Sequence, residues 1–189
     1  VPLLILDRDG VINHDSDQYI RNLAQWIPIP GSIEAIAELS KQGYQIAIAT
    51  NQSGLSRGYF TLDTLEEIHA ELCRLVEEAG GSIAGIFYCP HLPTEGCTCR
   101  KPDTGLLQAI EQELGESAKG AFFVGDSLKD LQAAQSFACK PVLVRTGKGS
   151  STEKQLNSSE AALASLQDTP VYNDLQQASQ AIIDSARHC

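Results

Sequence analysis

Long hydrophobic runs, basic residues and cysteines are all scarce in this sequence, and each shortage excludes a class of protein. No apolar stretch is long enough to span a bilayer, and no basic segment followed by an apolar run marks the N-terminus. We therefore expect neither a membrane span nor a signal peptide. Only 14 Lys and Arg stand against 24 Asp and Glu, and the net charge of −10 argues against nucleic acids and acidic membrane surfaces as partners.

The six cysteines are too few for a small protein held together by disulfides, and three of them crowd between residues 89 and 99. This clustering indicates a metal site in a reducing cytoplasm. Because the chain is acidic overall, any anionic ligand must meet locally placed cations, backbone amides or a metal.

The rest of the chain has the composition and length of one ordinary domain, residues 1–189, with 42% hydrophobic residues. Short apolar runs predict buried strands at residues 3–6, 45–49, 84–88, 121–125 and 141–145. Between them, helical periodicity covers residues 31–43, 61–81, 103–115 and 127–138. Strands that alternate with helices predict an α/β fold with a doubly wound, Rossmann-like parallel sheet.

Two segments depart from this alternation. Residues 89–102 are too rich in Cys and Pro for regular structure, and we expect them to be a loop inserted before the helix that starts near residue 103. Residues 146–169 lack strong periodicity, which predicts a loop with a marginal helix, before a short edge strand and a closing helix in residues 170–186.

Polar side chains gather where the predicted strands end. The first strand leads into Asp7 and Asp9, the second ends at Thr50, and the fourth leads into Asp126. Lys101 precedes a helix and can reach the same edge. In such sheets ligands bind at the carboxyl ends of the strands. Carboxylates suit Mg²⁺, whereas a hydroxyl, loop amides and an ammonium suit a phosphoryl group.

Each of these motifs has an ordinary structural alternative. The two N-terminal acids occur in turns, the sequence TNQSG at 50–54 is a common strand-to-loop turn, and Asp126 or Ser127 can cap a helix. Lys101 can be a solvated surface residue. Their joint arrival at successive strand ends favours one functional site.

The order of these residues resembles the haloacid-dehalogenase-like phosphohydrolases. The shared elements are D-x-D-G at residues 7–10, Thr50 after a strand, Lys101 before a helix, and G-D-x-x-x-D at residues 125–130. The forms DRDGVIN, TNQSG, YCPH, CTCRKP and FFVGDSLKD are similar to the histidinol-phosphatase-related branch of that superfamily. The resemblance covers about residues 3–145.

The resemblance implies a phosphatase mechanism that chemistry supports. Asp7 is expected to attack phosphorus and form an aspartyl-phosphate, while Asp9 is expected to act as general acid and then general base. The carboxylates of Asp7 and Asp126, with the backbone carbonyl of Asp9, are expected to hold a catalytic Mg²⁺. Thr50 and Lys101 are expected to bind the transferring phosphoryl group.

The cysteine-rich loop predicts a second, structural metal. Cys89, His91, Cys97 and Cys99 form a C-x-H-x5-C-x-C pattern. Three thiolates and one imidazole complete a closed tetrahedral Zn²⁺ shell, with no open position for catalysis. Such a zinc would fix the loop that leads into Arg100 and Lys101. The alternatives are free buried thiols or a disulfide.

Selectivity is expected to come from loops. Residues 13–30 and 54–61 are too short for a large cap domain, so we expect a minimal cap and an open site. Arg100 and Arg57 are candidates for a second phosphate, although both can be solvated surface charges. The other expected substrate-binding residues are Arg8, Asp15, Ser16, Asp17, Gln18, Asn51, Gln52 and Ser53.

The substrate that the resemblance implies is a small phosphorylated sugar, a heptose 1,7-bisphosphate of lipopolysaccharide-core biosynthesis, with the 7-phosphate removed. Histidinol phosphate is the alternative in the same chemical class. A non-catalytic receiver-like domain is the alternative in another class, and it would need neither Asp9 nor the zinc loop. Ser127 departs from the Lys that heptose-type relatives often have at this position. We expect the chain to act as a monomer.

Overall fold

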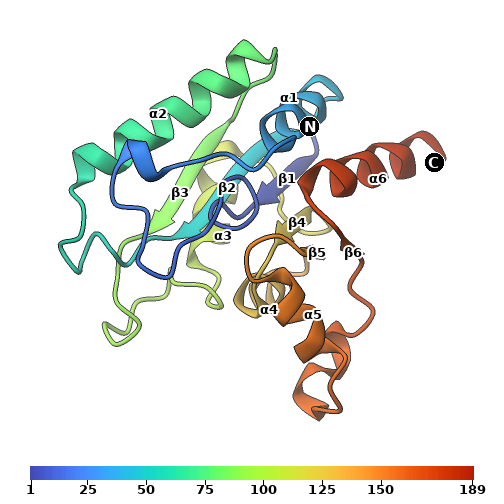
Figure 1. Ribbon diagram of the computed structural model, residues 1–189. Helices are drawn as coiled ribbons and strands as arrows, with labels where there is room; N and C mark the ends of the chain where they lie inside the picture. The colour runs from blue at the N-terminus through green and yellow to red at the C-terminus, as the bar shows by residue number, and fades with distance from the viewer.

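The protein is built around one parallel six-stranded sheet, as the computed structural model of residues 1–189 shows (Figure 1). The strand order is β3-β2-β1-β4-β5-β6. All neighbouring strands pair in parallel, which confirms the predicted sheet type. The strands are β1 (Leu3–Leu6), β2 (Gln45–Asn51), β3 (Gly85–Cys89), β4 (Phe122–Gly125), β5 (Lys140–Val144) and β6 (Val171–Tyr172).

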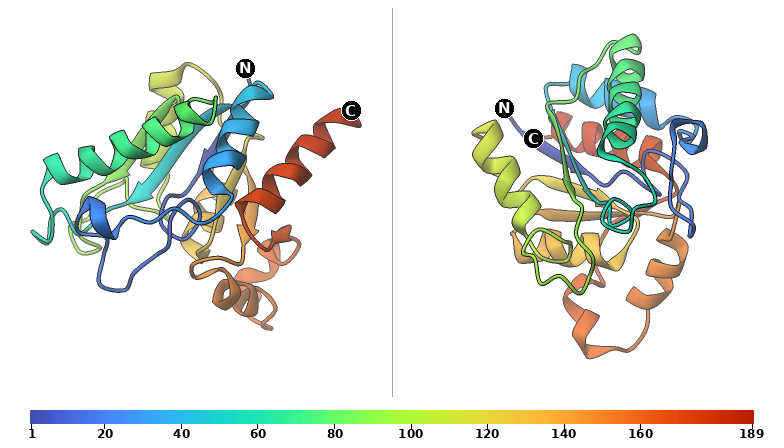
Figure 2. Two further views of the ribbon diagram at one scale, coloured as in Figure 1. Left: turned by 45° about the horizontal axis from the view of Figure 1, so that its top comes forward. Right: turned by 90° about the vertical axis from the view of Figure 1, so that its left-hand side faces the viewer.

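Helices cover both faces of this sheet, as Figure 2 shows. One face carries α1 (Ser32–Lys41), α2 (Leu62–Glu78) and α6 (Leu175–Arg187), and the other carries α3 (Gly105–Leu114) and α4 (Leu128–Ser136). Side chains alternate between these faces along a strand, so Leu4 and Leu6 belong to one core cluster and Leu3 and Ile5 to the other. The prediction of a doubly wound α/β fold is confirmed.

Local sequence explains where α2 begins and ends. Thr61 caps its first turn by accepting a hydrogen bond from the backbone N–H of Thr64, and Gly80 follows its end with a φ of 90°. The predicted apolar face is buried, and it consists of Leu65, Ile68, Leu72 and Val76.

The structure is more regular than predicted in two places. Strand β2 continues through Asn51, so Thr50 lies within a strand rather than after it. Residues 146–169 contain α5 (Gly149–Leu156) and the 3-10 helix η2 (Ala161–Leu166), where we expected a loop with one marginal helix. Leu156 and Leu166 pack there on α4 and β5. These tertiary contacts stabilise helices that the local periodicity does not predict.

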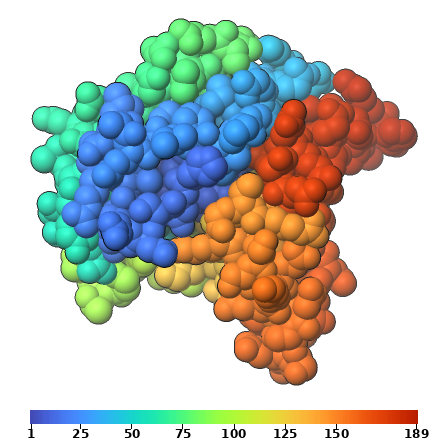
Figure 3. Space-filling model, viewed as in Figure 1, coloured from blue at the N-terminus to red at the C-terminus, as the bar shows by residue number.

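The surface around the strand ends is formed by loops. Figure 3 shows the segment before α1 (dark blue) beside the orange lobe that contains α5. Between residues 13 and 30 the only helix is the 3-10 helix η1 (Leu23–Gln25), in keeping with a minimal cap. None of the helices is long and apolar enough to cross a membrane.

Candidate active site

The chain turns sharply where β1 ends, and this turn presents Asp7 and Asp9. The carbonyl of Arg8 accepts hydrogen bonds from the N–H groups of Val11 and Ile12. Gly10 has a φ of 84°, a conformation that favours glycine. A Cβ at this position would also overlap the carboxylate of Asp126. Gly10 therefore allows the β1 turn to lie against the end of β4.

Lys101 links the two sides of this crevice. Its Nζ lies 2.9 Å from Asp7 Oδ1, 2.6 Å from Asp130 Oδ1 and 2.8 Å from the Ala49 carbonyl oxygen, so all three ammonium protons have acceptors. Burial alone would lower the pKa of Lys101, but the carboxylates of Asp130 and Asp7 raise it above its ordinary value. Lys101 is therefore a buried ammonium ion beside Asp7.

Asp130 organises both Lys101 and the start of α4. Its Oδ2 accepts hydrogen bonds from the backbone N–H groups of Asp126 and Ser127, each at 3.2 Å, and from the Ser127 hydroxyl at 3.0 Å. Ser127 in turn caps the helix through the backbone N–H of Asp130. Ser127 is thus the N-cap of α4.

Asp7 and Asp126 each have one carboxylate oxygen that accepts no hydrogen bond from the protein. Asp7 Oδ1 accepts from Lys101 and from the backbone N–H of Arg8, whereas Asp7 Oδ2 has no donor. Asp126 Oδ2 accepts from the backbone N–H of Lys148 at 2.9 Å, whereas its Oδ1 has none. One oxygen from each of Asp7, Asp126 and Asp130 can be chosen so that these atoms lie within 4.8 Å of one another.

The charge balance of the crevice fits a divalent cation. Four carboxylates and two cations meet here, namely Asp7, Asp9, Asp126 and Asp130 with Arg8 and Lys101. The cations balance two of the four negative charges. Burial and then Asp130 raise the pKa of Asp7 well above its usual range and that of Asp126 to about 7, which shows the cost of the uncompensated charge. Oxygen ligands with this excess charge suit Mg²⁺.

Asp9 lies in a different environment from Asp7. Its Oδ1 accepts from Arg8 Nε at 2.9 Å and from Asn13 Nδ2 at 2.9 Å, and its Oδ2 accepts from Gln52 Nε2 at 3.0 Å. Burial raises the pKa of Asp9, but the Arg8 guanidinium and these hydrogen bonds outweigh burial and lower it. Asp9 is therefore ionised and firmly oriented.

Residues at the end of β2 and just after it contact the groups that hold Asp7 and Asp9. Thr50 is buried, and its Oγ1 accepts from Gln52 Nε2 at 3.0 Å. The Asn51 side chain binds the backbone of Lys101, with Oδ1 accepting from its N–H at 3.0 Å and Nδ2 donating to its carbonyl at 3.2 Å. Ser53 is buried nearby in the chain. Asn51 thus fixes the Lys101 segment, and Gln52 joins Thr50 to Asp9.

Two surface loops flank the site and contact each other. The Tyr19 and Tyr59 rings lie 5.0 Å apart, and the Arg57 guanidinium lies 5.9 Å from the Tyr19 ring. In the first loop, Asp15 Oδ1 accepts from the backbone N–H of Ser16, and Ser16 Oγ accepts from that of Gln18. The side chain of Asp17 is exposed. These contacts connect residues 13–19 to residues 51–59.

Arg100 stands out among the cations. Its Nη1 is buried and has no hydrogen-bond acceptor in the protein, and no carboxylate lies within ion-pair distance. Arg8 differs, because its side chain is only 1% exposed and is bonded to Asp9. Arg100 is therefore free to bind an anion, whereas Arg8 is committed to Asp9.

The four expected zinc ligands form one cluster. Cys89 Sγ lies 3.6 Å from Cys97 Sγ, 2.8 Å from Cys99 Sγ and 3.4 Å from His91 Nδ1, and all six cysteines are free thiols. A tetrahedral Zn²⁺ with bonds of about 2.0–2.3 Å places its ligands about 3.5–3.8 Å apart. The donor set fits zinc, and the distances from Cys89 to Cys97 and to His91 are close to this spacing, whereas the distance from Cys89 to Cys99 is shorter. The backbone N–H of Gly105 binds the Thr98 carbonyl at 2.9 Å, which places this loop against the start of α3.

Some residues of this site were not predicted. Asn13 and Lys148 hold Asp9 and Asp126, and Thr146 Oγ1 donates to the Gly10 carbonyl at 2.6 Å. Residues 146–148 follow β5 at the carboxyl edge of the sheet, and that position was a signal for their role. The contact of His69 with Arg8 leaves no sequence signal, because it joins positions 61 residues apart.

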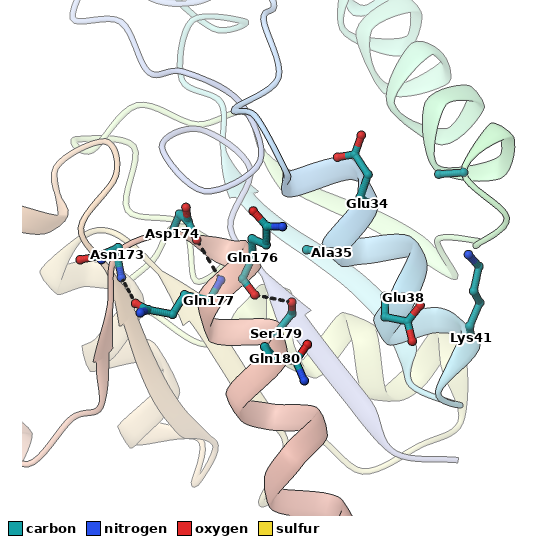
Figure 4. A pocket seen from close by; sticks show the side chains of 11 residues that line it. Glu34, Ala35, Glu38, Lys41, Asn173, Asp174, Gln176, Gln177, Ser179 and Gln180 are labelled. Atoms are coloured by element: carbon teal, nitrogen blue, oxygen red, sulfur yellow. Dashed lines mark hydrogen bonds between the residues drawn. The ribbon is translucent and has the colours of Figure 1, made fainter.

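A groove of about 710 Å³ between α1 and α6 lies apart from the strand-end site (Figure 4). It contains no candidate site residue. Two of its polar side chains bond to the backbone at the start of α6: Asp174 Oδ1 accepts from the Gln177 N–H, and Gln177 Oε1 accepts from the Asn173 N–H. They cap α6.

Comparisons with known proteins agree with this geometry. A family model described as haloacid dehalogenase-like hydrolase matches residues 2–137, and a HAD-hydrolase-like model matches residues 98–178. The D-glycero-β-D-manno-heptose-1,7-bisphosphate 7-phosphatase of Pseudomonas putida is 59% identical over 150 residues, which cover 79% of this chain and 86% of the relative. The phosphatase of the same name from Neisseria meningitidis is 50% identical over 153 residues, covering 81% and 82%.

A solved structure is similar over the whole chain. The crystal structure of D,D-heptose 1,7-bisphosphate phosphatase from B. bronchiseptica, complexed with magnesium and phosphate, is 42% identical. It aligns with a TM-score of 0.89 and covers 98% of this chain and 99% of that one.

Proposed function

The chain belongs to the haloacid dehalogenase-like hydrolase family, and from this premise we propose that it is a phosphatase that removes the 7-phosphate of D-glycero-β-D-manno-heptose 1,7-bisphosphate. Three features of the site carry this proposal. Asp7 has a donor-free oxygen beside the Lys101 ammonium, Asp9 is ionised, and the crevice holds two more negative than positive charges. The reaction would belong to lipopolysaccharide-core biosynthesis.

In the first half-reaction, the Asp7 carboxylate attacks the phosphorus atom through the oxygen that is not assigned to the metal ion. The bond between phosphorus and the sugar oxygen breaks, and a proton from Asp9 goes to that oxygen. Asp9 is ionised in the free protein, and an approaching phosphate dianion raises its pKa because like charges disfavour ionisation. Substrate binding therefore favours the protonated state of Asp9 that this step needs.

In the second half-reaction, water attacks the aspartyl-phosphate. Asp9 accepts a proton from this water, phosphate leaves, and Asp7 regains its carboxylate. The Thr50 hydroxyl and the Lys101 ammonium bind the phosphoryl oxygens in this proposal. Lys101 can do so by exchanging one of its three acceptors for a phosphate oxygen.

We assign a Mg²⁺ site to the free oxygens of Asp7 and Asp126 together with the Asp9 backbone carbonyl. When bound, the ion neutralises the repulsion between the nucleophilic carboxylate and the phosphate. Asp130 is the less suitable ligand, because both of its oxygens accept hydrogen bonds from the protein.

The second phosphate of the substrate is best matched by Arg100. Its buried Nη1 lacks an acceptor, and a phosphate would supply one. Arg57 is exposed and lies over Tyr19 at the rim, where it could meet the same group. We propose that Asp15, Ser16, Asp17 and Gln18, with Ser53, contact the sugar, while Arg8, Asn51 and Gln52 act through other site residues.

The Cys/His cluster is proposed to bind structural Zn²⁺. Its three thiols ligate zinc only when they are reduced, so we place the reaction in the cytoplasm. We also propose that residues 1–189 work as one domain and as a monomer.

The proposal is tested by phosphate release from the heptose 1,7-bisphosphate with Mg²⁺. Histidinol phosphate and a panel of sugar monophosphates serve as competitors. We expect the highest kcat/KM with the heptose bisphosphate and loss of the 7-phosphate. A higher kcat/KM with histidinol phosphate would replace this substrate by the alternative, and a stable aspartyl-phosphate without turnover would indicate a receiver-like domain.

A further inference from the structure

Arg8 is the largest fully buried side chain in the protein, and its burial needs an explanation. A buried cation is costly unless it is paired and hydrogen-bonded. The carboxylate of Asp9 satisfies one side of the guanidinium, since its Oδ1 lies 2.9 Å from Nε and 2.8 Å from Nη2. On the other side, Arg8 Nη1 lies 3.1 Å from Nε2 of His69, which comes from the middle of α2.

The chemistry of this contact fixes the state of His69. Arginine has donors only, so His69 Nε2 must be the acceptor and carry no proton. The ring is then neutral, with its proton on Nδ1. Burial and then the charge of Arg8 lower the pKa of His69 to about 3, which agrees with a neutral ring. The Tyr88 ring lies 6.2 Å away at an angle of 51° and packs beside it.

Asp9 is therefore held from three directions. Gln52 donates to it from the residue that follows β2, Asn13 donates from the β1 turn, and Arg8 donates from the side of α2. Gln52 and Asn13 are attached directly to the loops of the site. Arg8 depends on His69, because no other acceptor besides Asp9 is bonded to its guanidinium.

We propose that His69 is a positioning residue for the general acid–base Asp9, acting through Arg8. By accepting a hydrogen bond from Nη1, it fixes the plane of the guanidinium and so the direction in which Asp9 Oδ2 faces the leaving oxygen. This inference rests on the proposed function, because it assigns a partner to Asp9 in the same reaction. The inference goes beyond the proposed function because it gives a role to His69, a residue of helix α2 that lies away from the strand ends.

A matched pair of variants separates the acceptor from the bulk of the ring. His69→Gln keeps an acceptor oxygen near the position of Nε2, and His69→Phe keeps the ring but offers none. Cys73→Ala, one turn further along α2 and also half-buried, is the control for disturbed helix packing.

The diagnostic measurement is kcat/KM for two leaving groups. The heptose bisphosphate has an alkoxide leaving group that needs a proton, whereas p-nitrophenyl phosphate has a phenolate that leaves without one. Because kcat/KM reports only the steps through formation of the aspartyl-phosphate, a displaced Asp9 lowers it for the sugar alone. We expect His69→Phe to lose about tenfold on the sugar phosphate and less than about twofold on the aryl phosphate, with His69→Gln close to wild type.

A second readout does not depend on activity. In NMR spectra of the full chain with ¹⁵N-labelled histidine, His69 is expected as the Nδ1–H tautomer, identified by the loss of its signals in His69→Gln. A proton on Nε2 would overturn the inference even if the phosphatase is active. Equal losses on both substrates in His69→Phe, or no loss, would also overturn it. Absence of wild-type turnover on any sugar phosphate would instead defeat the proposed function, while the tautomer still reports on the contact.

Discussion

Asp7 and Asp9 are separated by one residue, yet their surroundings shift their pKa values in opposite directions. Burial and then the neighbouring carboxylates raise the pKa of Asp7, while at Asp9 the Arg8 guanidinium and the hydrogen-bond donors outweigh burial and lower the pKa. Arg8, between them in sequence, turns toward Asp9 and leaves Asp7 to Lys101. Two adjacent acids can therefore take different roles, one as a nucleophile that a divalent cation must neutralise and one as an oriented proton carrier.

Replacing the nucleophile Asp7 should abolish turnover without unfolding the protein. We expect Asp7→Asn to lower phosphate release by at least about a thousandfold, because the amide cannot form the aspartyl-phosphate. The change keeps the size of the side chain, so the fold should persist by circular dichroism. Asp168→Asn, on an exposed turn to which the site assigns no role, should retain activity, and an active Asp7→Asn enzyme would refute the assignment.

The buried neutral imidazole of His69 should affect stability at acid pH. In the unfolded chain His69 has its ordinary pKa of 6.5, and in the folded protein the pKa is about 3. The unfolded state thus binds more protons between these values. His69 therefore does not reduce the free energy of unfolding above pH 6.5. As the pH falls from 6.5 toward 3, that free energy decreases by up to about 1.4 kcal/mol per pH unit.

Urea unfolding at several pH values checks this effect. The free energy of unfolding of the wild type should fall relative to that of His69→Gln between pH 6.5 and 5. Parallel curves for the two proteins would show that His69 is protonated in the folded state as easily as in the unfolded state.

At the scale of elements, helix α4 connects stability with the site. Its capping box uses Ser127 and Asp130, and the same Asp130 binds the Lys101 ammonium at 2.6 Å. The loop before α3 has a similar double role, because the Cys/His cluster leads directly into Arg100 and Lys101. Elements that look structural therefore hold the cations of the site.

Removing the N-cap of α4 should lower both the stability of the protein and its turnover. Ser127→Ala is expected to lower the free energy of unfolding by about 1 kcal/mol, and to lower kcat as Asp130 loses the hydroxyl that orients it. Asp174→Ala removes the N-cap of α6 outside the site and is the matched control. It should destabilise the protein by a similar amount without lowering kcat. Unchanged kcat in Ser127→Ala would contradict the connection.

Zinc should be required for the loop that carries Arg100. Protein purified without chelators is expected to contain about one zinc per chain by elemental analysis. Removal of zinc should lower activity with Mg²⁺ in excess, because the loop loses its fixed shape. Cys99→Ser should do the same, whereas Cys139→Ala, which removes a buried thiol outside the cluster, should keep its zinc. A zinc-free active enzyme would disprove the site.

At the scale of the whole molecule, the strand order explains why the site lies where it does. The sheet runs β3-β2-β1 in one direction and β4-β5-β6 in the other, so the chain connections diverge between β1 and β4. A crevice forms at the carboxyl ends of strands at such a reversal. Asp7 follows β1 and Asp126 follows β4, which places the two proposed metal ligands on either side of it.

Magnesium should therefore stabilise the entire fold. Ligands that bind only the folded state raise its stability, by about 2.7 kcal/mol at a concentration of 100 Kd. We expect Mg²⁺ to raise the Tm of the wild type. Asp126→Asn should abolish this increase and raise the Tm of the metal-free protein, because it removes one uncompensated buried charge. Asp15→Asn, on the surface loop, should keep the response to Mg²⁺.

The sequence alone was sufficient for the sheet, most helices and the main chemical groups. Apolar runs and helical periodicity are local properties, so they located β1 to β5 and the buried face of α2. The rule that ligands bind at strand ends then brought Asp7, Thr50, Lys101 and Asp126 together before any coordinates. The spacing of the Cys/His cluster was equally visible, because its ligands lie within 11 residues of one another.

Only the tertiary structure decided how these groups divide the work. That Arg8 pairs with Asp9 rather than facing substrate, that Asn51 binds the Lys101 backbone, and that His69 meets Arg8 are results of packing between distant segments. The helices of residues 149–166 likewise depend on burial against α4 and β5. Local patterns determine which residues reach the edge of the sheet, but pairing between buried donors and acceptors depends on three-dimensional contacts that no local pattern contains.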